Sequence, residues 1–175
     1  MKTALKSLLI LVFAALAGYF LTIYITPRYI LLKIKFNSGS KMNVPVYSDV
    51  MTDKDRQVVM PNPDFIYAAS GYNLNNGPIR ITGIMSDSTY SSVAFYSDNT
   101  LNFYIKNDKQ TKNKKYSFIL TKDEEDKVKY PNDEVIISPS NFGTILTRTL
   151  IDKPENIQEL MVVQRSFKVE KLNNQ

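Results

Sequence analysis

An uncharged run from Ser7 to Thr26 constrains this chain more than any other feature. A helix rises about 1.5 Å per residue, so a helix of this length crosses a hydrocarbon core about 30 Å thick. A cleaved signal peptide is the alternative, because Ala15-Leu16-Ala17 has the small residues of a cleavage site. The apolar stretch continues past that site through Tyr19–Ile25. This continuation favours an uncleaved transmembrane helix over residues 7–26, with residues 1–6 as a short cytoplasmic N-terminus.

The segment that follows, residues 27–43, is basic. Arg28, Lys33 and Lys35 interleave with apolar residues, and two interpretations remain open. The segment is either an amphipathic helix lying on anionic lipid or a continuation of the anchor whose basic side chains reach up to the headgroups. Asn37–Asn43 has the composition of a flexible linker. Residues 44–175 form the remaining domain.

The net charge of +5 comes from 22 basic and 17 acidic residues, and its distribution matters more than its size. Six positive charges precede the first acidic residue, Asp49, so the excess belongs to the membrane end of the chain. The rest of the sequence is nearly neutral. We therefore predict a contact with the lipid bilayer and no nucleic-acid partner.

Histidine and cysteine are both absent from the chain. Their absence excludes disulfides, Cys/His zinc sites and any catalytic triad or dyad that needs histidine or cysteine. Chemistry would have to rest on carboxylates, tyrosine, serine or lysine. We predict neither a metal nor a cofactor.

The most patterned stretch of the domain is Pro61–Gly83. Two prolines lead into Phe65–Tyr72. This segment carries apolar residues on both faces of an extended chain, which predicts a strand covered on both sides. Asn76-Gly77 favours a type I′ turn, and Ile79 and Ile81 then alternate with polar residues. The stretch predicts a β-hairpin.

Short strands separated by turns are predicted for most of the remaining domain. Asp152, followed by Pro154 and Glu155, predicts the capped start of a C-terminal helix over Pro154–Ser166. The chain is thus predicted to be mainly β, with one N-terminal transmembrane helix, an antiparallel β-sandwich or jelly-roll-like ectodomain and a C-terminal α-helix. The other predicted strands are Arg56–Met60, Tyr90–Tyr96, Leu101–Lys106, Tyr116–Thr121, Glu134–Ser138 and Gly143–Ile151.

Two stretches resemble a bacterial family called domain of unknown function 1254. PNPDFIYAASGYNLNNGPIRITG, Pro61–Gly83, resembles its signature, and SPSNFGTILTRTLIDKPENIQELMVVQRSFKVEKL, Ser138–Leu172, resembles its end. Together they bracket about Arg56–Leu172. One departure is Asn73-Leu74, where the family's turn has Asp-Leu, so a role needing a carboxylate at that corner is not carried over.

The resemblance implies a setting and a partner. Short anchored members of the family suggest a single-pass protein of the inner (cell) membrane with its C-terminal domain in the periplasm, a choice that the flanking charges leave nearly tied. In longer members a second domain, domain of unknown function 1214, follows in the same chain. This implies a hetero-complex with a companion membrane protein that resembles the second domain. The predicted contact face is rich in aromatic residues, namely Tyr67, Tyr72, Tyr90, Tyr96 and Tyr104.

Candidate site residues gather around the start of the predicted hairpin. An aspartate near a tyrosine and an arginine can act as a general base or bind a polar ligand, which would suit a hydrolase-like or small-ligand-binding domain. The structural alternative is that Asp64 bonds backbone N–H groups and Tyr67 packs in the core with a wet hydroxyl. We favour a non-catalytic subunit or binding module, with Asp64 and Tyr67 as the catalytic candidates and Asn62, Asp64, Tyr67, Arg80, Asp98 and Arg148 as the binding candidates.

Overall fold

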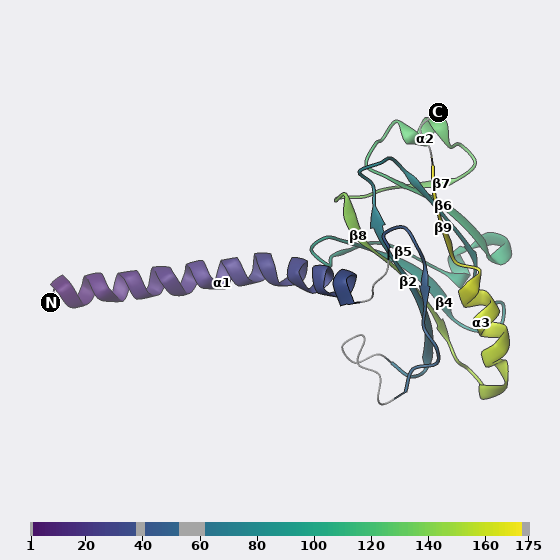
Figure 1. Cartoon of the computed structure of the whole chain (residues 1–175), viewed down its shortest axis with the longest axis horizontal. Coiled ribbons are helices and arrows are strands. Elements are labelled where there is room, and N and C mark those ends of the chain that lie inside the picture. The colour runs from purple at the N-terminus through teal and green to yellow at the C-terminus, as the bar shows by residue number, and fades with distance from the viewer. Residues whose placement is uncertain (1, 38–40, 53–61, 173–175) are drawn as a thin grey trace.

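The computed structural model of the chain describes residues 2–37, 41–52 and 62–172. A long N-terminal helix leads into a domain built of two β-sheets and a C-terminal helix (Figure 1). The helices are α1 (Lys2–Asn37), α2 (Asp126–Lys129) and α3 (Ile157–Arg165), and the 3-10 turns are η1 (Asp108–Gln110), η2 (Lys112–Lys114) and η3 (Pro154–Asn156). The strands are β1 (Val46–Tyr47), β2 (Phe65–Asn73), β3 (Ile79–Ile84), β4 (Ser91–Ser97), β5 (Asn102–Asn107), β6 (Lys115–Thr121), β7 (Glu134–Ile137), β8 (Phe142–Leu150) and β9 (Lys168–Lys171).

Helix α1 contains the predicted apolar span. Thr3–Ile30, a stretch of 28 residues, is long and apolar enough to cross a membrane. The helix continues through Pro27 to Asn37, so residues 27–37 of the basic segment belong to the same helix and do not start a separate one. Arg28 lies on this extension, and its guanidinium donates a hydrogen bond of 2.9 Å to the Tyr24 carbonyl one turn back.

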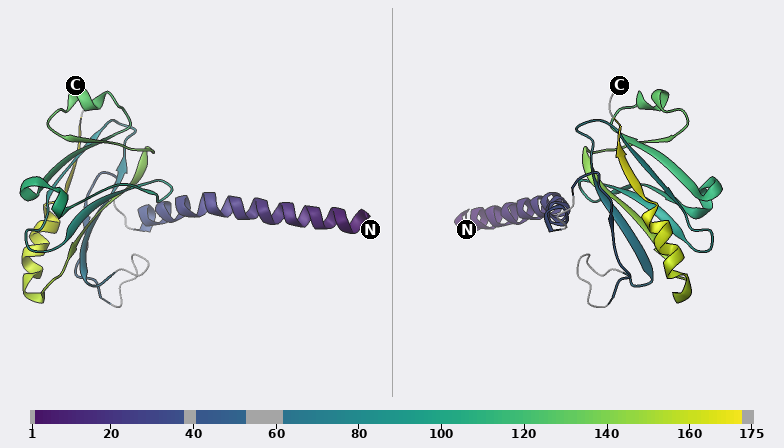
Figure 2. Two further views of the ribbon diagram at one scale, coloured as in Figure 1. Left: turned by 180° about the vertical axis from the view of Figure 1, so that it is seen from behind. Right: turned by 45° about the vertical axis from the view of Figure 1, so that its right-hand side comes forward.

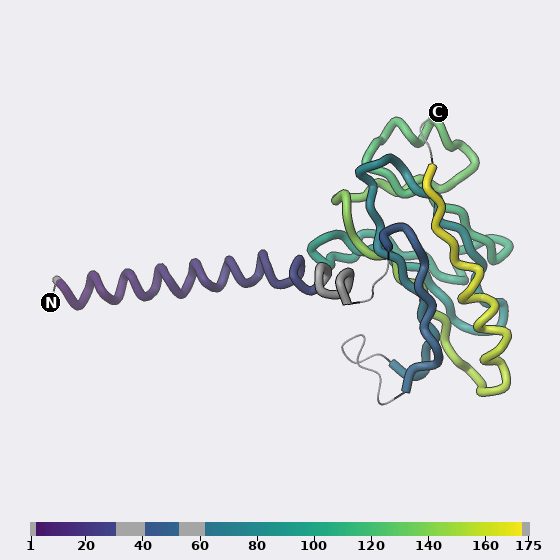
Figure 3. Tube along the Cα trace, in the orientation of Figure 1, coloured from purple at the N-terminus to yellow at the C-terminus, as the bar shows by residue number. Residues whose placement is uncertain are grey.

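The domain is a sandwich of two sheets. Sheet A has the strand order β1-β2-β8-β4-β5, and sheet B has the order β7-β6-β3-β9. Every pair is antiparallel except β6 with β7. The predicted mainly β, sandwich-like class is therefore confirmed, with a C-terminal helix as expected. Figure 3 follows the chain from α1 to α3 and β9, which lie on the far side of the domain from α1.

The predicted β-hairpin is wrong. Strands β2 and β3 do not pair with each other: β2 pairs with β1 and β8 in sheet A, and β3 pairs with β6 and β9 in sheet B. The turn between them closes from the Gly77 N–H to the Leu74 carbonyl, 3.2 Å, so its central residues are Asn75 and Asn76. Gly77 has a φ of 109°, but Asn76 lacks the positive φ that a type I′ turn needs at both central residues.

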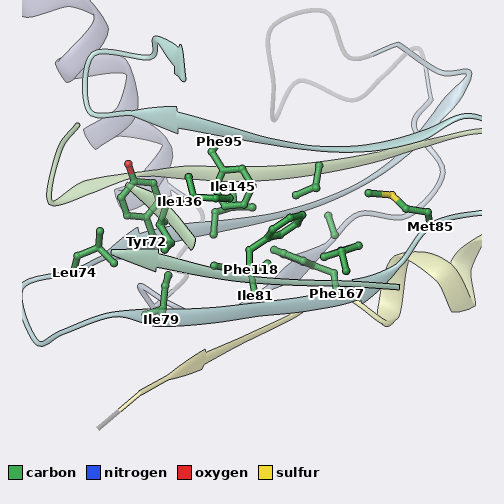
Figure 4. Close-up of a cluster of buried hydrophobic side chains, with 14 residues drawn as sticks. Tyr72, Leu74, Ile79, Ile81, Met85, Phe95, Phe118, Ile136, Ile145 and Phe167 are labelled. Atoms are coloured by element: carbon green, nitrogen blue, oxygen red, sulfur yellow. The ribbon is translucent and has the colours of Figure 1, made fainter. Parts of the chain in front are cut away.

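Burial explains why the chain crosses between sheets here. Tyr72, Leu74 and Ile79 are all buried in one core cluster. A flat hairpin would place β2 and β3 side by side in one sheet, whereas the crossing sets them on facing layers with apolar side chains pointing at each other (Figure 4). The burial of apolar area on both layers outweighs the local preference of the Asn-Gly pair for a tight hairpin turn.

Aromatic rings fill the centre of the sandwich. Phe95 of sheet A meets Phe118 of sheet B edge-to-face at 5.7 Å between ring centroids, and both side chains are fully buried. Tyr116 stacks on Phe118 at 5.3 Å. Edge-to-face and offset contacts of this kind stabilise beyond the area that they bury. Figure 4 shows the cluster, with Ile145 and Ile136 contributed by the two sheets.

The C-terminal helix is shorter than predicted and begins differently. Helix α3 starts at Ile157, after a 3-10 turn, and buries Leu160 completely. The predicted cap by Asp152, with Glu155 as its acidic partner, does not form, because the residue that precedes the 3-10 turn is Lys153 and the turn has no side-chain cap. The Asp152 carboxylate instead accepts hydrogen bonds from the Asn156 side-chain amide at 3.0 and 3.1 Å. Gln164 of α3 ties the helix to sheet A through the Tyr67 carbonyl, 2.6 Å away.

Two short strands, β1 and β9, were not predicted, because Val46–Tyr47 and Lys168–Lys171 are too brief to show a periodicity. The strand predicted over Arg56–Met60 lies outside the described residues. The other predicted strands occur within a residue or two of their expected bounds.

A polar contact joins the two sheets at the β5–β7 side of the sandwich. Glu134 of β7 accepts hydrogen bonds from the Tyr104 hydroxyl and the Lys106 ammonium of β5. Burial would raise the pKa of the Glu134 carboxyl, but these two hydrogen bonds and the Lys106 charge outweigh it and hold the pKa below its ordinary value of 4.5. A depressed carboxyl pKa stabilises the fold above the unfolded-state pKa and loses that effect as the pH falls.

We therefore expect Glu134→Gln to lower the unfolding free energy at pH 7 by less than about 1 kcal/mol, because the pair is partly exposed. The difference from the wild type should shrink as the pH falls below 4.5, where the unfolded carboxyl takes up its proton, and vanish below the lowered pKa of the native carboxyl. Urea unfolding of the full chain in detergent at pH 7 and pH 3 measures this. Glu124→Gln, at the exposed pair with Lys127, is the control and should change little at either pH. Equal losses for Glu134→Gln at both pH values would contradict the assignment.

Candidate functional site

The outer face of sheet A, the face turned away from the sandwich core, is the most distinctive surface of the described chain. On β2 and β8 every second residue is buried against the core and the residues between them are half-buried. The half-buried set forms this outer face, and β4 and β5 extend it. Its central members are Phe65, Tyr67, Ala69, Ser92, Ala94, Leu146, Arg148 and Leu150.

An apolar row runs straight across all five strands of this face. The strand register pairs Val46 with Ala69, Ala69 with Leu146, Leu146 with Ala94, and Ala94 with Ile105. Leu146 stands between two alanines, so its side chain rises above its neighbours. Val46 and Ile105, at the two ends, are 43% and 48% exposed. A continuous apolar row on a sheet face is the pattern of a surface that another layer covers.

Arg148 lies in the next row, between Tyr67 of β2 and Ser92 of β4. Its Nε donates to Ser92 Oγ at 3.1 Å and its Nη2 donates to the Tyr90 hydroxyl at 3.3 Å. The guanidinium carbon lies 5.8 Å from the centre of the Phe65 ring and 5.6 Å from that of Tyr90, within the range of cation–π attraction. These partners are all neutral.

No carboxylate among the described residues forms an ion pair with Arg148. A half-buried guanidinium carries five N–H donors, and the two hydrogen bonds to hydroxyls leave others for an incoming group. A planar carboxylate or a phosphate matches the geometry of that fork. A positive charge beside an apolar row is therefore the chemical signature of this face.

The pKa of the Tyr90 phenol is lowered by the neighbouring Ser92 and Arg148. Burial would raise the pKa of its phenol, but hydrogen bonds with Ser92 and Arg148, together with the Arg148 charge, outweigh burial and bring the pKa below its ordinary value. A phenol with a lowered pKa is a stronger hydrogen-bond donor. Tyr90 and Arg148 can thus donate to the same anionic group.

The predicted site residues at the start of β2, Asn62, Asp64 and Tyr67, are joined by hydrogen bonds between side chains and backbone. Asn62 Oδ1 accepts a hydrogen bond of 2.9 Å from the Asp64 N–H, so the side chain that bonds backbone two residues on belongs to Asn62 and not to Asp64. The Tyr67 hydroxyl reaches the Asn62 carbonyl at 3.5 Å. Asp64 is exposed, and its own carbonyl accepts from the Ile151 N–H at 2.8 Å. This group closes the end of β2 against β8.

Arg80 and Asp98 lie elsewhere. Arg80 is on β3 in the other sheet, where its Nη2 lies 2.9 Å from Asp133 Oδ2. Asp98 is in the turn after β4, and its carboxylate lies 3.5 Å from Arg28 Nε of α1. Of the six predicted binding residues, the structure brings together Asn62, Asp64 and Tyr67, and the β2–β8 register adds Arg148 opposite Tyr67.

The predicted aromatic face divides between two surfaces. Tyr72 and Tyr104 point toward the core, where the Tyr72 hydroxyl bonds Ser138 Oγ at 2.9 Å and Tyr104 meets Phe95 edge-to-face. Tyr67, Tyr90 and Tyr96 remain on the outer side of sheet A. The sequence missed Phe65, Ser92 and Leu146 as members of this surface, although period-two alternation on β8 already sets Leu146 and Arg148 on one face.

The groups at this site are hydrogen-bond donors and apolar surfaces. Within the part of the chain that the structure describes, no cluster of three or more acidic residues could hold a metal ion. The groups around Arg148 are hydroxyls and aromatic rings, which donate hydrogen bonds and offer apolar contact area. What this surface can do, on these groups, is bind an apolar partner that carries an anion.

Comparison with known proteins gives a family and a fold. A family model described as Protein of unknown function (DUF1254) matches residues 42–171. Among solved structures, the VPA0106 protein from Vibrio parahaemolyticus is similar with a TM-score of 0.63 and 13% identity, over 86% of this chain and 37% of that one. An uncharacterized protein from Burkholderia cenocepacia is similar with a TM-score of 0.53 and 14% identity, over 85% of this chain and 41% of that one. No curated protein matches.

These likenesses concern the fold, and the chain covers 37% and 41% of the length of the two solved relatives. The family match is of a different kind, since it covers most of the chain and nearly all of the described sandwich. The chain belongs to the DUF1254 family of proteins of unknown function.

Proposed function

We propose that this protein is a membrane-anchored binding module, without catalysis of its own, whose outer sheet A face holds a companion membrane protein. The observation that carries the proposal is the apolar row through Leu146 with Arg148 beside it. We expect the companion to resemble the second domain found in longer members of the family.

The apolar row supplies the affinity. Leu146, flanked by Ala69 and Ala94, fits a groove on a partner as a single projecting side chain, and Val46 and Ile105 extend the contact to both edges of the sheet. Protein interfaces gain most of their binding energy from a few such residues that lose all contact with water. Apolar surface buried there contributes about 25 cal/mol per Å².

Arg148 supplies the specificity. Surrounded by Phe65, Tyr90 and Ser92, it gains no negative charge from the described part of its own chain. A companion that brings a carboxylate to this position satisfies the remaining donors, and a partner without one leaves a charge buried and unpaired. The companion is therefore apolar across the row and acidic opposite Arg148.

The proposed membrane anchor places the binding face at the membrane surface, where a companion membrane protein also lies. Helix α1 is proposed to cross the inner (cell) membrane once, with the sandwich on the periplasmic side. In Figures 1 and 2, α1 leaves the domain on the side opposite α3. Confinement of both proteins to one membrane raises their effective concentration, as linking two modules does.

A small anionic ligand at Arg148 and Tyr90 is the second candidate, because the lowered phenol pKa favours donation to an anion. A domain of that kind would be ligand-binding or hydrolase-like, as the group around Asp64 first indicated. It differs from the companion hypothesis in one respect: a small ligand at Arg148 leaves the row through Leu146 without a role.

Site-specific photo-cross-linking separates the two candidates. We expect benzoylphenylalanine placed at Leu146 of the full chain, irradiated in intact native cells, to form one discrete adduct with a membrane protein. The same residue at Val162, which is 65% exposed on α3, is the matched control and should form no such adduct. Mass spectrometry then identifies the partner.

An adduct from both positions would mean non-specific capture, and the absence of any protein adduct from position 146, or adducts with lipid alone, would overturn the companion assignment. A small ligand at Arg148 predicts this second pattern.

A further inference from the structure

The turn between β4 and β5, residues 98–101, lies against α1. Its Asp98 carboxylate forms an ion pair with Arg28, 3.5 Å from Nε, and Arg28 in turn lies over the Tyr24 ring at 4.0 Å. Between this turn and the helix is a groove of about 760 Å³, lined by Phe20, Ile23, Tyr24, Pro27, Arg28, Asn99, Thr100 and Leu101. The lining of the groove is mostly apolar.

The turn is built rigidly enough to present a side chain outward. Thr100 adopts a φ of 65°, and its N–H bonds the Ser97 carbonyl at 2.9 Å. Asn99 Oδ1 accepts from the Leu101 N–H at 3.1 Å, and the Asp98 N–H donates to Ser140 Oγ at 3.1 Å, which fixes the turn to the body of the domain. Leu101 is nevertheless 62% exposed at the tip.

The depth of this turn follows from its position along the helix. A hydrocarbon core about 30 Å thick takes up about 20 helical residues, which is the length of the uncharged run Ser7–Thr26. Phe20, Ile23 and Tyr24 then lie in the last two turns of that core, and Arg28 lies just above it. A turn that shares a groove with these residues sits at the level where hydrocarbon meets headgroups.

We propose that the β4–β5 turn is a second membrane contact: Leu101 inserts at the boundary between acyl chains and headgroups, and lipid fills the groove between the turn and α1. The acyl chain packs on Phe20 and Ile23, and the headgroup lies beside Arg28, Asn99 and Thr100. Tyrosine and arginine are the side chains that prefer this level of a bilayer. The contact rests on the proposed membrane anchor and fixes how the sandwich stands above the surface.

The chain has no cysteine, so single labels can be placed without background. We would attach an environment-sensitive fluorophore at one of three cysteine substitutions in the full chain, reconstituted into phosphatidylcholine and phosphatidylglycerol vesicles. The positions are Thr100 in the turn, Leu16 at the middle of the uncharged run in α1, and Val128 in α2, which is 84% exposed. Spin-labelled lipids, carrying the label at the headgroup or deep in the chain, then quench the emission according to depth.

The proposal predicts blue-shifted emission at Thr100 with strong quenching by headgroup labels, quenching at Leu16 by deep labels, and neither at Val128. Adding Leu101→Asp should abolish the quenching at Thr100 and leave Leu16 unchanged. If Leu16 is quenched while Thr100 behaves like Val128, the second contact is wrong and the anchor stands. If Leu16 is not quenched, the anchor fails, and the second contact fails with it. Quenching at Thr100 that survives Leu101→Asp also overturns the proposal.

Discussion

Gly143→Ala is expected to lower the unfolding free energy by at least about 3 kcal/mol, the upper range for overpacking a filled core. A Cβ atom at this position would lie 2.1 Å from the Tyr96 carbonyl oxygen and 2.5 Å from atoms of the Tyr72 ring. The first neighbour is backbone of the adjacent strand β4. The second is fully buried, with its hydroxyl held by Ser138 at 2.9 Å. Neither can move without breaking a hydrogen bond or repacking the core shown in Figure 4.

Gly71→Ala is the matched control, because Gly71 lies on the adjacent strand β2. Its Cβ would meet the Met42 sulfur at 2.9 Å, which is the far end of a flexible side chain. We expect a loss below about 1 kcal/mol there, since methionine adapts its rotamers readily. Urea unfolding followed by circular dichroism in detergent measures both. Similar losses for the two variants would show that β8 is not packed as closely as the sandwich requires.

Single strands were predictable from the sequence because burial alternates along them. The residues 65–73 and 142–150 each alternate between buried and half-buried positions over a whole strand, and such a period-two pattern is local. The fold class follows from counting such segments. The same holds for α1, whose uncharged run is longer than any helix in a small sandwich core needs.

Strand pairing was not predictable, because it depends on contacts far apart in the sequence. Strand β2 pairs with β8, which joins Tyr67 to Arg148. Asn76 and Gly77 instead favoured pairing β2 with the strand that follows it. The burial of Tyr72 and Ile79 on facing layers outweighs that local preference. A local sequence pattern does not indicate which of the two sheets a strand joins.

The candidate site shows the same limit. The predicted hairpin placed Arg80 beside β2, so it entered the binding set, but β3 belongs to sheet B and Arg80 pairs with Asp133. Arg148 was named, but its neighbours Tyr90 and Ser92 could be found only through the β8–β4 register. The sequence indicated which residue types could form a site, but it did not indicate which of them lie together.

Leu146→Asp is expected to weaken the companion's binding by at least about 100-fold, about 3 kcal/mol. The substitution puts a carboxylate at the centre of the apolar row, where burial against a partner leaves it without water. Position 146 is also two residues from Arg148 on the same face of β8, so the new charge neutralises the arginine that the companion's own carboxylate needs. Both effects oppose binding.

Val162→Asp is the matched control, since Val162 is 65% exposed on α3, outside the proposed interface. Thermal unfolding of each free variant checks that the fold is intact, because a half-buried strand position tolerates aspartate less well than an exposed helix position. A variant that unfolds at a much lower temperature would be replaced by Leu146→Thr, which keeps the strand preference and removes the projecting apolar side chain.

The most direct test of the binding face is the amount of companion that co-purifies with full-length protein from native membranes in mild detergent. The companion is the membrane protein captured from position 146 by photo-cross-linking. We predict that wild-type protein and Val162→Asp recover it in equal amounts and that folded Leu146→Asp recovers none. Recovery by Leu146→Asp at the wild-type level would contradict the assignment of the outer sheet A face as a binding surface.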